Sequence, residues 1–154
     1  MLRSFNTPGQ GCLMRLSPAA ELAVRGIVVL ADHYGEGPTT LKTICGVRDL
    51  PKQYLVKLFS LLAKADIVTA IRGKHGGYEL SRAPKEITLL EVIEAVEGPI
   101  ALNFCQHNPP KCDREDCPLR AVWTELQRTV RQRLGAVRLS QCLSKGAPSP
   151  RPRA

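Results

Sequence analysis

Two short helical patterns separated by a very tight turn constrain the fold of this chain more than any other feature. Apolar residues at helical spacing predict a first helix from about Thr40 to Arg48. Asp49 and Leu50 form the turn, and Pro51 opens a second helix with the sequence PKQYLVKLFSLLAKA. Two helices joined in this way form a helix-turn-helix. The predicted apolar face of the second helix consists of Tyr54, Leu55, Leu58, Phe59, Leu61 and Leu62.

A glycine-rich hairpin follows the second helix directly. The segment DIVTAIRGKHGGYELS has apolar residues on both sides of RGKHGG. Gly73, Gly76 and Gly77 allow positive φ angles in the turn, so the pattern indicates a β-hairpin. A hairpin placed directly after a helix-turn-helix is a wing, and the sequence therefore predicts a winged helix.

Further helices are predicted on both sides of this unit. Ser17 as N-cap and Pro18 at the first helical position open a helix that stops near His33. Thr88 and Glu91 form a capping box that opens another helix after the hairpin. The winged unit is therefore expected to be covered by helical segments from both ends of the chain.

A long C-terminal helix is predicted from Pro118 to about Leu139. At ~1.5 Å per residue it would be more than ~30 Å long. Its apolar stripe either folds back on the chain's own domain or packs against a second copy of the chain. We favour the second copy, because helix-turn-helix proteins read two-fold sites as dimers. The stripe, at steps of three and four, consists of Leu119, Val122, Trp123, Leu126, Val130, Leu134 and Val137.

The predicted fold class is mainly α with a small β-hairpin: a winged helix-turn-helix domain plus a long C-terminal dimerisation helix. Met14 is a candidate for the true start, because structure is expected to begin just after it. The expected parts are a flexible extension (1–13), the winged helix-turn-helix domain (14–98), a cysteine-rich loop (99–117), the dimerisation helix (118–143) and a disordered basic tail (144–154).

Charge and cysteine usage limit the classes of function. Among 154 residues, 22 are Lys or Arg and 14 are Asp or Glu, a formal charge of +8 that suggests a polyanionic partner such as nucleic acid. No apolar run approaches the ~18 residues of a membrane span, and no secretory signal opens the chain. We therefore expect a cytoplasmic protein whose six cysteines stay reduced and form no disulfide scaffold.

The predicted recognition helix and wing carry residues suited to double-stranded DNA. Val56 belongs to the outer face of the helix, where the lysines can contact phosphate or guanine and Gln53 can pair with adenine. At the hairpin tip, Arg72 can enter a narrow minor groove. The alternatives are a solvated helix surface and a plain hairpin with a charged tip. The predicted DNA-binding residues are Lys52, Gln53, Tyr54, Lys57, Arg72, Gly73, Lys74, His75 and Gly76.

Three cysteines lie in the loop before the long helix. Cys105, Cys112 and Cys117 are spaced C-x6-C-x4-C, and Pro109 and Pro110 prevent a helix between the first two. Structural zinc prefers close pairs of ligands, whereas a wide loop of three thiolates suits an iron–sulfur cluster better. Zinc and a metal-free thiol switch remain alternatives.

The other cysteines carry less information. Cys45 lies beside Ile44 on the first helix of the helix-turn-helix and is expected to be a core residue. Cys12 and Cys142 are isolated, and no role is assigned to them.

These segments together resemble the Rrf2 family of bacterial transcription regulators. The resemblance covers about residues 14–143 and is carried by MRLSPAAELAV, YLVKLFSLLAKADIVTAIRGKHGGYELSR, ITLLEVIEAVEGP and the three-cysteine loop before a long helix. It implies a winged-helix homodimer that swaps its long C-terminal helix across a two-fold axis and places Arg72 in the minor groove. Where some members carry a base-reading Glu, this chain has Val56, which leaves its operator preference open.

The resemblance also implies a set of ligands for an iron–sulfur cluster, either 2Fe-2S or 4Fe-4S. Cluster-binding members place three cysteines in this loop, and some take a carboxylate from the first helix of the opposite subunit. Glu21 occupies that position, and His107 within the loop is the rival fourth ligand. Other members use a His where this chain has Arg120 or Arg25, neither of which can ligate.

The function expected from this resemblance is a DNA-binding transcriptional repressor that senses redox state, nitric oxide or iron–sulfur status through the cluster. The alternative is a regulator of the same family without a cluster, which acts through thiols or a partner protein. A winged helix that binds RNA or protein is a further alternative. An enzyme is not expected, because His33, His75 and His107 form no pair at ligand spacing.

Overall fold

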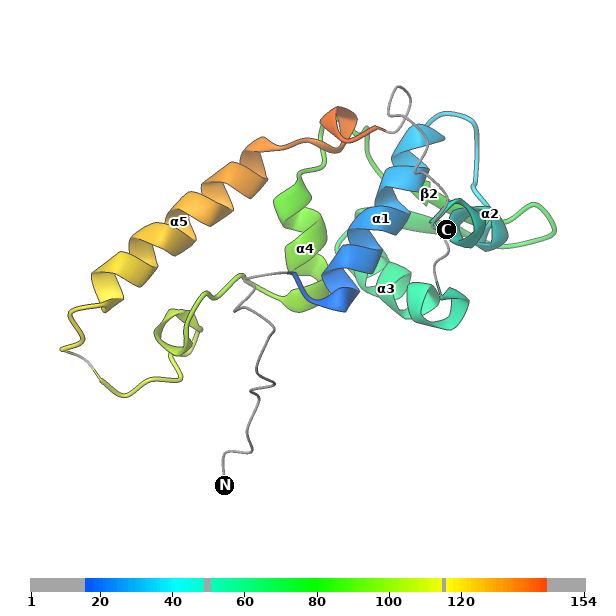
Figure 1. The fold of residues 1–154 in the computed structure, drawn as a ribbon. Helices are drawn as coiled ribbons and strands as arrows, with labels where there is room; N and C mark the ends of the chain where they lie inside the picture. The colour runs from blue at the N-terminus through cyan, green and yellow to red at the C-terminus, as the bar shows by residue number, and fades with distance from the viewer. Residues whose placement is uncertain (1–15, 49–50, 115, 144–154) are drawn as a thin grey trace, which may run out of the picture.

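The computed structural model describes residues 16–48, 51–114 and 116–143. The predicted extension 1–13, Met14, Cys12, the turn at 49–50 and the tail 144–154 lie outside these ranges. The elements are α1 (Pro18–Asp32), α2 (Leu41–Arg48), α3 (Lys52–Lys64), β1 (Val68–Ile71), β2 (Gly77–Leu80), α4 (Leu89–Glu97), the 3-10 helix η1 (Phe104–Gln106), α5 (Arg120–Ala136) and the 3-10 helix η2 (Leu139–Gln141) (Figure 1).

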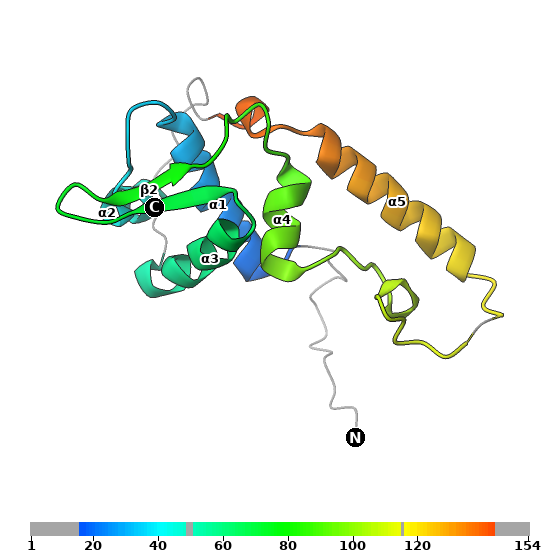
Figure 2. The ribbon, with the colours of Figure 1, turned by 180° about the vertical axis from the view of Figure 1, so that it is seen from behind.

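The described chain is mainly helical with one two-stranded antiparallel hairpin, as the sequence predicts. In the hairpin, Val68 pairs with Leu80 and Ile71 pairs with Gly77. Helices α1 to α4 and the hairpin form one body, and α5 lies on the α4 side of that body (Figures 1 and 2). Within the described ranges, no helix is both long and apolar enough to cross a membrane.

Helix α1 runs through the middle of the core. Its first turn is capped by the Ser17 hydroxyl, which accepts a hydrogen bond from the backbone N–H of Ala20 at 3.2 Å, as predicted. Large buried side chains from three helices fill the interior, among them Ile27 of α1, Phe59 of α3 and Val92 of α4. Burial of such side chains contributes about 1.5–3 kcal/mol each to the free energy of unfolding.

The capping box of α4 is formed as predicted. The Thr88 hydroxyl accepts a hydrogen bond from the Glu91 N–H at 3.1 Å, and the Glu91 carboxylate accepts one from the Thr88 N–H at 2.7 Å. The same carboxylate also accepts a hydrogen bond from Arg82 at 3.1 Å. Burial raises the pKa of Glu91, but the hydrogen bonds from Thr88 and the charge of Arg82 outweigh it and hold the pKa below its ordinary value.

The buried face of α3 is narrower than the sequence predicts. Leu55, Leu58 and Phe59 are buried together with Leu62, but Tyr54 and Leu61 are 40% and 36% exposed. The prediction that these two belong to the apolar face is therefore wrong. The buried residues lie toward α1 and α4, and Tyr54 and Leu61 fall outside that sector of the helix.

The C-terminal helix is shorter than predicted. Helix α5 begins at Arg120 and ends at Ala136, so it is about 25 Å long rather than more than 30 Å. The chain leaves the helix at Val137, whose carbonyl accepts a hydrogen bond from the Leu89 N–H at 2.9 Å. The Leu139 N–H then donates to the Ile87 carbonyl at 3.0 Å, and the Leu139 side chain is fully buried in the core of the winged domain.

The apolar stripe of α5 is divided into two halves. Val130 and Leu134, in the C-terminal half, are half-buried on the side of α4. In the N-terminal half, Leu119, Val122 and Leu126 are 56%, 51% and 46% exposed. The chain's own domain therefore meets one half of the stripe, and the packing of a second copy on the other half stays a prediction.

Candidate nucleic-acid interface and cysteine loop

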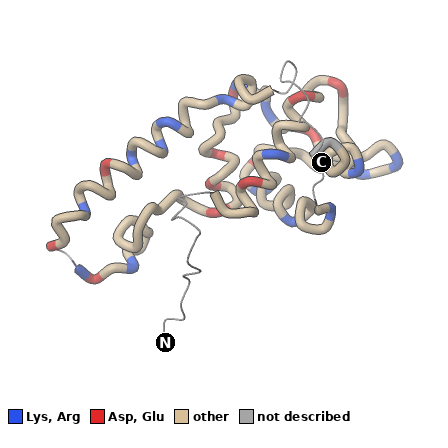
Figure 3. The backbone as a smooth tube through the Cα atoms, in the orientation of Figure 1, with Lys and Arg blue, Asp and Glu red and all other residues tan. Residues whose placement is uncertain are grey.

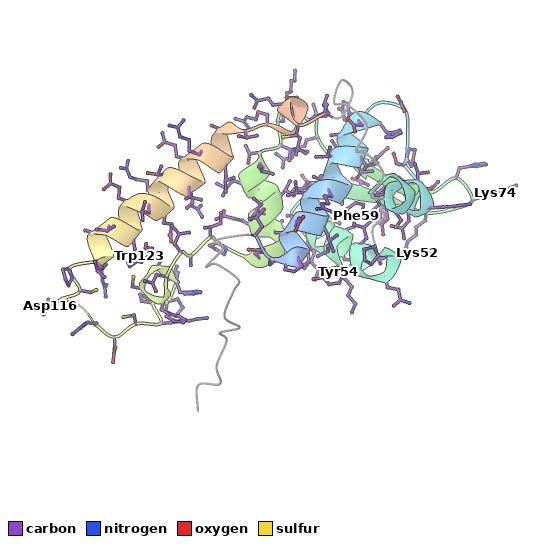
Figure 4. The ribbon with its side chains drawn as sticks, viewed as in Figure 1. Lys52, Tyr54, Phe59, Lys74, Asp116 and Trp123 are labelled. Carbon is purple, nitrogen blue, oxygen red and sulfur yellow. The ribbon has the colours of Figure 1, made fainter. Side chains whose placement is uncertain are left out.

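The outer face of α3 is formed by polar residues of its first turns. Lys52, Gln53 and Lys57 are exposed, and Val56 among them is 38% exposed. They point away from the core because the buried residues occupy the opposite side of the helix. Figure 4 shows Lys52 and Tyr54 projecting from α3 into solvent.

Tyr78 connects α3, the hairpin and the segment before α2. Its ring makes an edge-to-face contact with Phe59 of α3, with the ring centroids 4.8 Å apart. Its backbone N–H and carbonyl pair with Thr39 at 2.9 and 2.8 Å. These contacts fix the hairpin relative to α3. This role of Tyr78 was not predicted, although an aromatic residue directly after two glycines in a strand is a signal for it.

The hairpin tip depends on its glycines for two different reasons. Gly73 has a φ of +113°, a conformation that residues with a side chain rarely adopt. Gly76 and Gly77 do not have positive φ, contrary to the prediction. A Cβ on Gly76 would collide with the Ile71 carbonyl oxygen, and one on Gly77 would collide with the Thr39 carbonyl oxygen.

The tip of the hairpin and the outer face of α3 are both basic. Arg72, Lys74 and His75 are exposed at the tip, with Gly73 between the first two. In the described part of the chain, the three ion pairs lie elsewhere and leave Lys52, Lys57, Arg72 and Lys74 without an acidic partner. Figure 3 shows Lys and Arg at the hairpin tip and on α3. Two unpaired basic elements on one body are suited to the phosphates of a duplex.

The cysteine loop lies at the other end of the molecule. Figure 4 shows Asp116 and Trp123 at one end and Lys74 at the opposite end. Cys105 belongs to η1, whereas Cys112 and Cys117 lie in irregular segments, and all three are half-buried free thiols. The loop folds back on itself, because the Lys111 N–H donates to the Phe104 carbonyl at 2.9 Å.

Hydrogen bonds attach this loop to α5. The Gln106 amide donates to the Thr124 hydroxyl at 3.2 Å and to the Cys105 sulfur at 3.5 Å. The Leu102 N–H donates to the Gln127 side chain at 3.4 Å. A change in the conformation of the loop would therefore act first on α5.

Glu94 of α4 links the loop and α5 to the winged domain. Its carboxylate accepts a hydrogen bond from the Ile100 N–H at 2.9 Å and forms an ion pair with Arg131 of α5. Helix α4 in turn packs against α1 and α3. This link was not predicted, because Glu94 and Arg131 have the sequence pattern of ordinary surface charges.

The predicted cluster ligands are not gathered into one metal-binding group. Among the described residues, no three His, Cys, Asp or Glu side chains lie close enough together to hold a metal ion. Glu21 is exposed on α1 and forms an ion pair with Arg25, one turn later. His107 stacks on Phe104, with the ring centroids 6.4 Å apart, and lines a cavity of about 550 Å³ beside α5.

Arg120 is the one described residue whose buried side-chain nitrogen has no hydrogen-bond partner. This atom is its Nε, and the residue lies on the same concave surface as Cys117. A buried N–H without an acceptor costs about 1–3 kcal/mol. An anionic acceptor at this place would remove that cost. From the sequence, Arg120 was identified only as a residue that cannot ligate a cluster.

Comparisons with known proteins agree with this arrangement. A family profile described as Rrf2, iron-dependent transcriptional regulator, matches residues 16–145. The transcriptional regulator CymR of Bacillus subtilis is 33% identical over 85% of this chain and 91% of its own length. The transcriptional regulator IscR of Xenorhabdus nematophila is 33% identical over 83% of this chain and 78% of its own length. These relatives are regulators of transcription rather than enzymes.

Solved structures show the same fold. CymR, described as the global cysteine regulator of B. subtilis, superimposes with a TM-score of 0.73 and 31% identity, over 86% of this chain and 98% of its own. IscR of T. potens superimposes with a TM-score of 0.70 and 27% identity, over 92% of this chain and 94% of its own. The winged arrangement of α2, α3 and the hairpin is therefore shared with known regulators.

Proposed function

We propose that this chain, which belongs to the Rrf2 family of transcriptional regulators, binds a double-stranded DNA operator through α3 and the β1–β2 hairpin and alters that binding through its cysteine loop. The observation that carries the proposal is the Phe59–Tyr78 contact, which holds two exposed basic elements in a fixed relation. The protein would act in the cytoplasm.

In the proposed complex, α3 enters the major groove and the hairpin reaches the adjacent minor groove. Lys52 and Lys57 would contact phosphate or guanine, and Gln53 would pair with adenine. Arg72 at the hairpin tip would enter the minor groove, where the potential is most negative. The Gly73 and Gly76 backbone, Lys74, His75 and the half-exposed Tyr54 would contact the sugar-phosphate backbone.

The DNA part of the proposal is tested by binding to the duplex upstream of the chain's own gene. Arg72→Ala should weaken binding more than tenfold and lower the slope of log affinity against log salt by about 1. Arg128→Ala, an exposed arginine on α5 outside the proposed interface, is the control. Binding to RNA in preference to the duplex, or equal binding by both variants, would contradict the proposal.

A second copy of the chain is part of the proposed active form. Leu119, Val122 and Leu126 form an exposed apolar surface on α5 that the described part of the chain does not cover. Two-fold operators are read by dimers whose recognition helices are held at a fixed spacing. Pairing of α5 with its copy would cover this surface and set that spacing.

The cysteine loop is proposed to hold an iron–sulfur cluster through Cys105, Cys112 and Cys117. Thiolate sulfur is the usual ligand of such clusters, so the donor chemistry fits. The unpartnered Nε of Arg120 near Cys117 fits as well, because it would donate to an anionic sulfur. When bound, the cluster would make the loop reactive to oxidants or nitric oxide.

The arrangement within one chain is incomplete for this purpose, since no group of three potential ligands is assembled in the described ranges. The loop would have to close around the cluster, and a fourth ligand would complete the set. Glu21 of the partner subunit and His107 of the same loop are the two candidates. Glu21 is accessible, because its side chain is 54% exposed.

Signal transfer would follow the contacts that attach the loop to the rest of the chain. Gln106 and Leu102 connect the loop to α5 through Thr124 and Gln127. Glu94 then connects α5 to α4, which packs on α3. A change in the loop would therefore alter the position of α3 relative to α5 and, in a dimer, the spacing of the two recognition helices.

The test of the cluster is anaerobic purification followed by iron and sulfide assays and a visible absorption spectrum. The wild type should contain iron and sulfide, and the variant with Cys105, Cys112 and Cys117 changed to Ala should contain neither. Cys142→Ala, a half-buried cysteine outside the loop, should keep both. A colourless wild type without iron after reconstitution would contradict the cluster and leave the DNA-binding proposal intact.

The same regulator without a cluster is the second candidate. It is favoured by the dispersed arrangement of the potential ligands and by the likeness to CymR, described as a global cysteine regulator. In that case the loop would respond through its thiols or through a partner protein. An iron-free wild type whose DNA binding changes on thiol oxidation, with no such change in the triple Ala variant, would support this candidate.

A further inference from the structure

We infer that Val56 reads a thymine in the major groove by contact with the thymine C5-methyl group, and so determines part of the operator sequence. The inference rests on the proposed DNA binding by α3. Val56 lies three residues after Gln53 and one before Lys57, on the side of α3 opposite the buried Leu58 and Leu62. Its side chain is 38% exposed.

The fold of the described chain gives no reason for a valine at this position. Val56 belongs neither to the hydrophobic core nor to the partly buried residues packed against it. Valine is also a weaker helix former than Lys, Gln or Glu by several tenths of a kcal/mol. An exposed valine in the middle of a recognition helix therefore costs helix stability, and it makes no contact with the described hydrophobic core that would offset the cost.

Val56 is also not part of a larger apolar surface on α3. The other large exposed apolar residues of the helix, Tyr54 and Leu61, lie roughly 140–160° around the helix axis from it, and the small Ala63 lies about two turns further along the same side. Its neighbours on the outer face are Gln53, Lys57 and Ser60. A single apolar side chain surrounded by amide and ammonium groups is a poor surface for another protein and a good match for a methyl group among phosphates.

The geometry of valine suits this contact. A β-branched side chain in a helix adopts one χ1 rotamer almost exclusively, so its two methyl groups are held in fixed positions. Ser60, one turn later, donates its hydroxyl hydrogen back to the Val56 carbonyl at 3.0 Å and has none left for a base. Val56 is thus a rigid apolar contact beside an amide that can pair with adenine.

Among the bases, only thymine presents a methyl group in the major groove, and side chains such as Ala and the Thr methyl recognise it by apolar contact. Cytosine lacks this methyl and presents an amino group that valine cannot accept. The face formed by Gln53 and Val56 therefore favours a half-site with an adenine and a thymine at neighbouring positions, one read by an amide and the other by a methyl contact.

The test begins with in vitro selection of binding sites from random-sequence duplexes by the full chain. Each thymine of the selected half-site is then replaced by deoxyuridine, which removes only the C5-methyl group. At one position per half-site the replacement should weaken binding of the wild type about fourfold, the value expected for one buried methyl group. Val56→Ser, which has no methyl group, should bind the thymine and deoxyuridine sites with equal affinity at that position.

Lys57→Ala is the matched control, because it changes the adjacent residue of the same face. It should weaken binding to both sites and keep the fourfold difference between them. If selection yields a site but no deoxyuridine replacement weakens the wild type, or if Val56→Ser keeps the difference, the inference is wrong. Failure of the wild type to select any duplex would instead overturn the proposed DNA binding, and the inference with it.

Discussion

Gly76 is a residue of the hairpin where the structure leaves no room for a side chain. A Cβ there would collide with the Ile71 carbonyl oxygen and come within 3.0 Å of the Gly73 carbonyl oxygen, both of which are backbone atoms. Gly76→Ala should therefore force the turn open, lower the free energy of unfolding by about 1–3 kcal/mol and reduce DNA affinity. Urea unfolding and binding to the selected duplex measure the two effects.

Gly46 provides the matched control for this variant. It lies inside α2, and nothing is within 4 Å of the place its Cβ would take. Gly46→Ala should raise the free energy of unfolding by up to about 1 kcal/mol, because alanine favours the helix over glycine. A Gly76→Ala variant that is as stable as the wild type would show that the collision at Gly76 is relieved by movement of the turn.

The carboxylate of Glu91 makes the free energy of unfolding depend on pH. Its hydrogen bonds with Thr88 and Arg82 determine the direction of this dependence. Its folded pKa lies below the ordinary value of 4.5, so the charged form is favoured by folding. Its contribution is then fully present above about pH 4.5 and is lost as the pH falls through the folded pKa. At pH 7, Glu91→Gln should lower the free energy of unfolding by about 0.5–2 kcal/mol through the weakened cap.

The predicted pH dependence is tested by measuring the free energy of unfolding of the wild type and of Glu91→Gln between pH 7 and pH 3. The difference between the two proteins should shrink as the pH falls below about 4.5, because only the wild type loses a charge at this position. Glu125→Gln, an exposed change on α5, should show no comparable difference. If the difference in free energy of unfolding between the wild type and Glu91→Gln stays constant down to pH 3, the charge of the Glu91 carboxylate is not its cause.

At the scale of elements, the segment after α5 belongs to the winged domain. Leu139 of η2 is fully buried against residues of the winged-domain core. Leu139→Ala should lower the free energy of unfolding by about 2–5 kcal/mol, whereas Leu126→Ala, at a position 46% exposed on α5, should cost much less within one chain. Equal effects in dilute, monomeric protein would show that the C-terminal segment does not fold against the core.

Some features of the helices and the hairpin could be predicted from the sequence, and others could not. The caps at Ser17 and Thr88 and the presence of the hairpin were predicted correctly, because their signals are contained within a few neighbouring residues. The positive φ expected at Gly76 and Gly77 was wrong. The exposure of Tyr54 and the end of α5 were not, because both depend on which distant element packs nearby. Val137 leaves the helix to pair with Leu89, a partner far away in the sequence.

At the scale of the whole molecule, the proposed DNA-binding surface could be predicted from the sequence more fully than the cysteine site. The basic side chains of α3 and the hairpin could be predicted from one contiguous stretch of sequence, and the structure places them on one body. The cysteine site could be predicted only as a list of candidate ligands. Its three thiols lie in a loop without a regular element to fix their spacing, and they do not converge with another ligand in the described ranges.

The division of the α5 stripe predicts how the whole molecule assembles. The C-terminal half is occupied by the chain's own α4, so only the half with Leu119, Val122 and Leu126 is available to a second copy. Leu126→Glu places a charge in that surface and should convert a dimer into a monomer in sedimentation experiments. Far-UV circular dichroism should change little, because Leu126 has no place in the core.

Gln132→Glu introduces the same charge at an exposed position of α5 outside the surface formed by Leu119, Val122 and Leu126, roughly 120° around the helix axis from Leu126, and should leave the dimer intact. Because a dimer binds both half-sites at once, Leu126→Glu should also reduce affinity for a two-fold duplex at least tenfold while a single half-site is bound as by the wild type. A wild type that stays monomeric at micromolar concentration, or a dimer that tolerates Glu at 126, would mean that this surface is not where two copies meet.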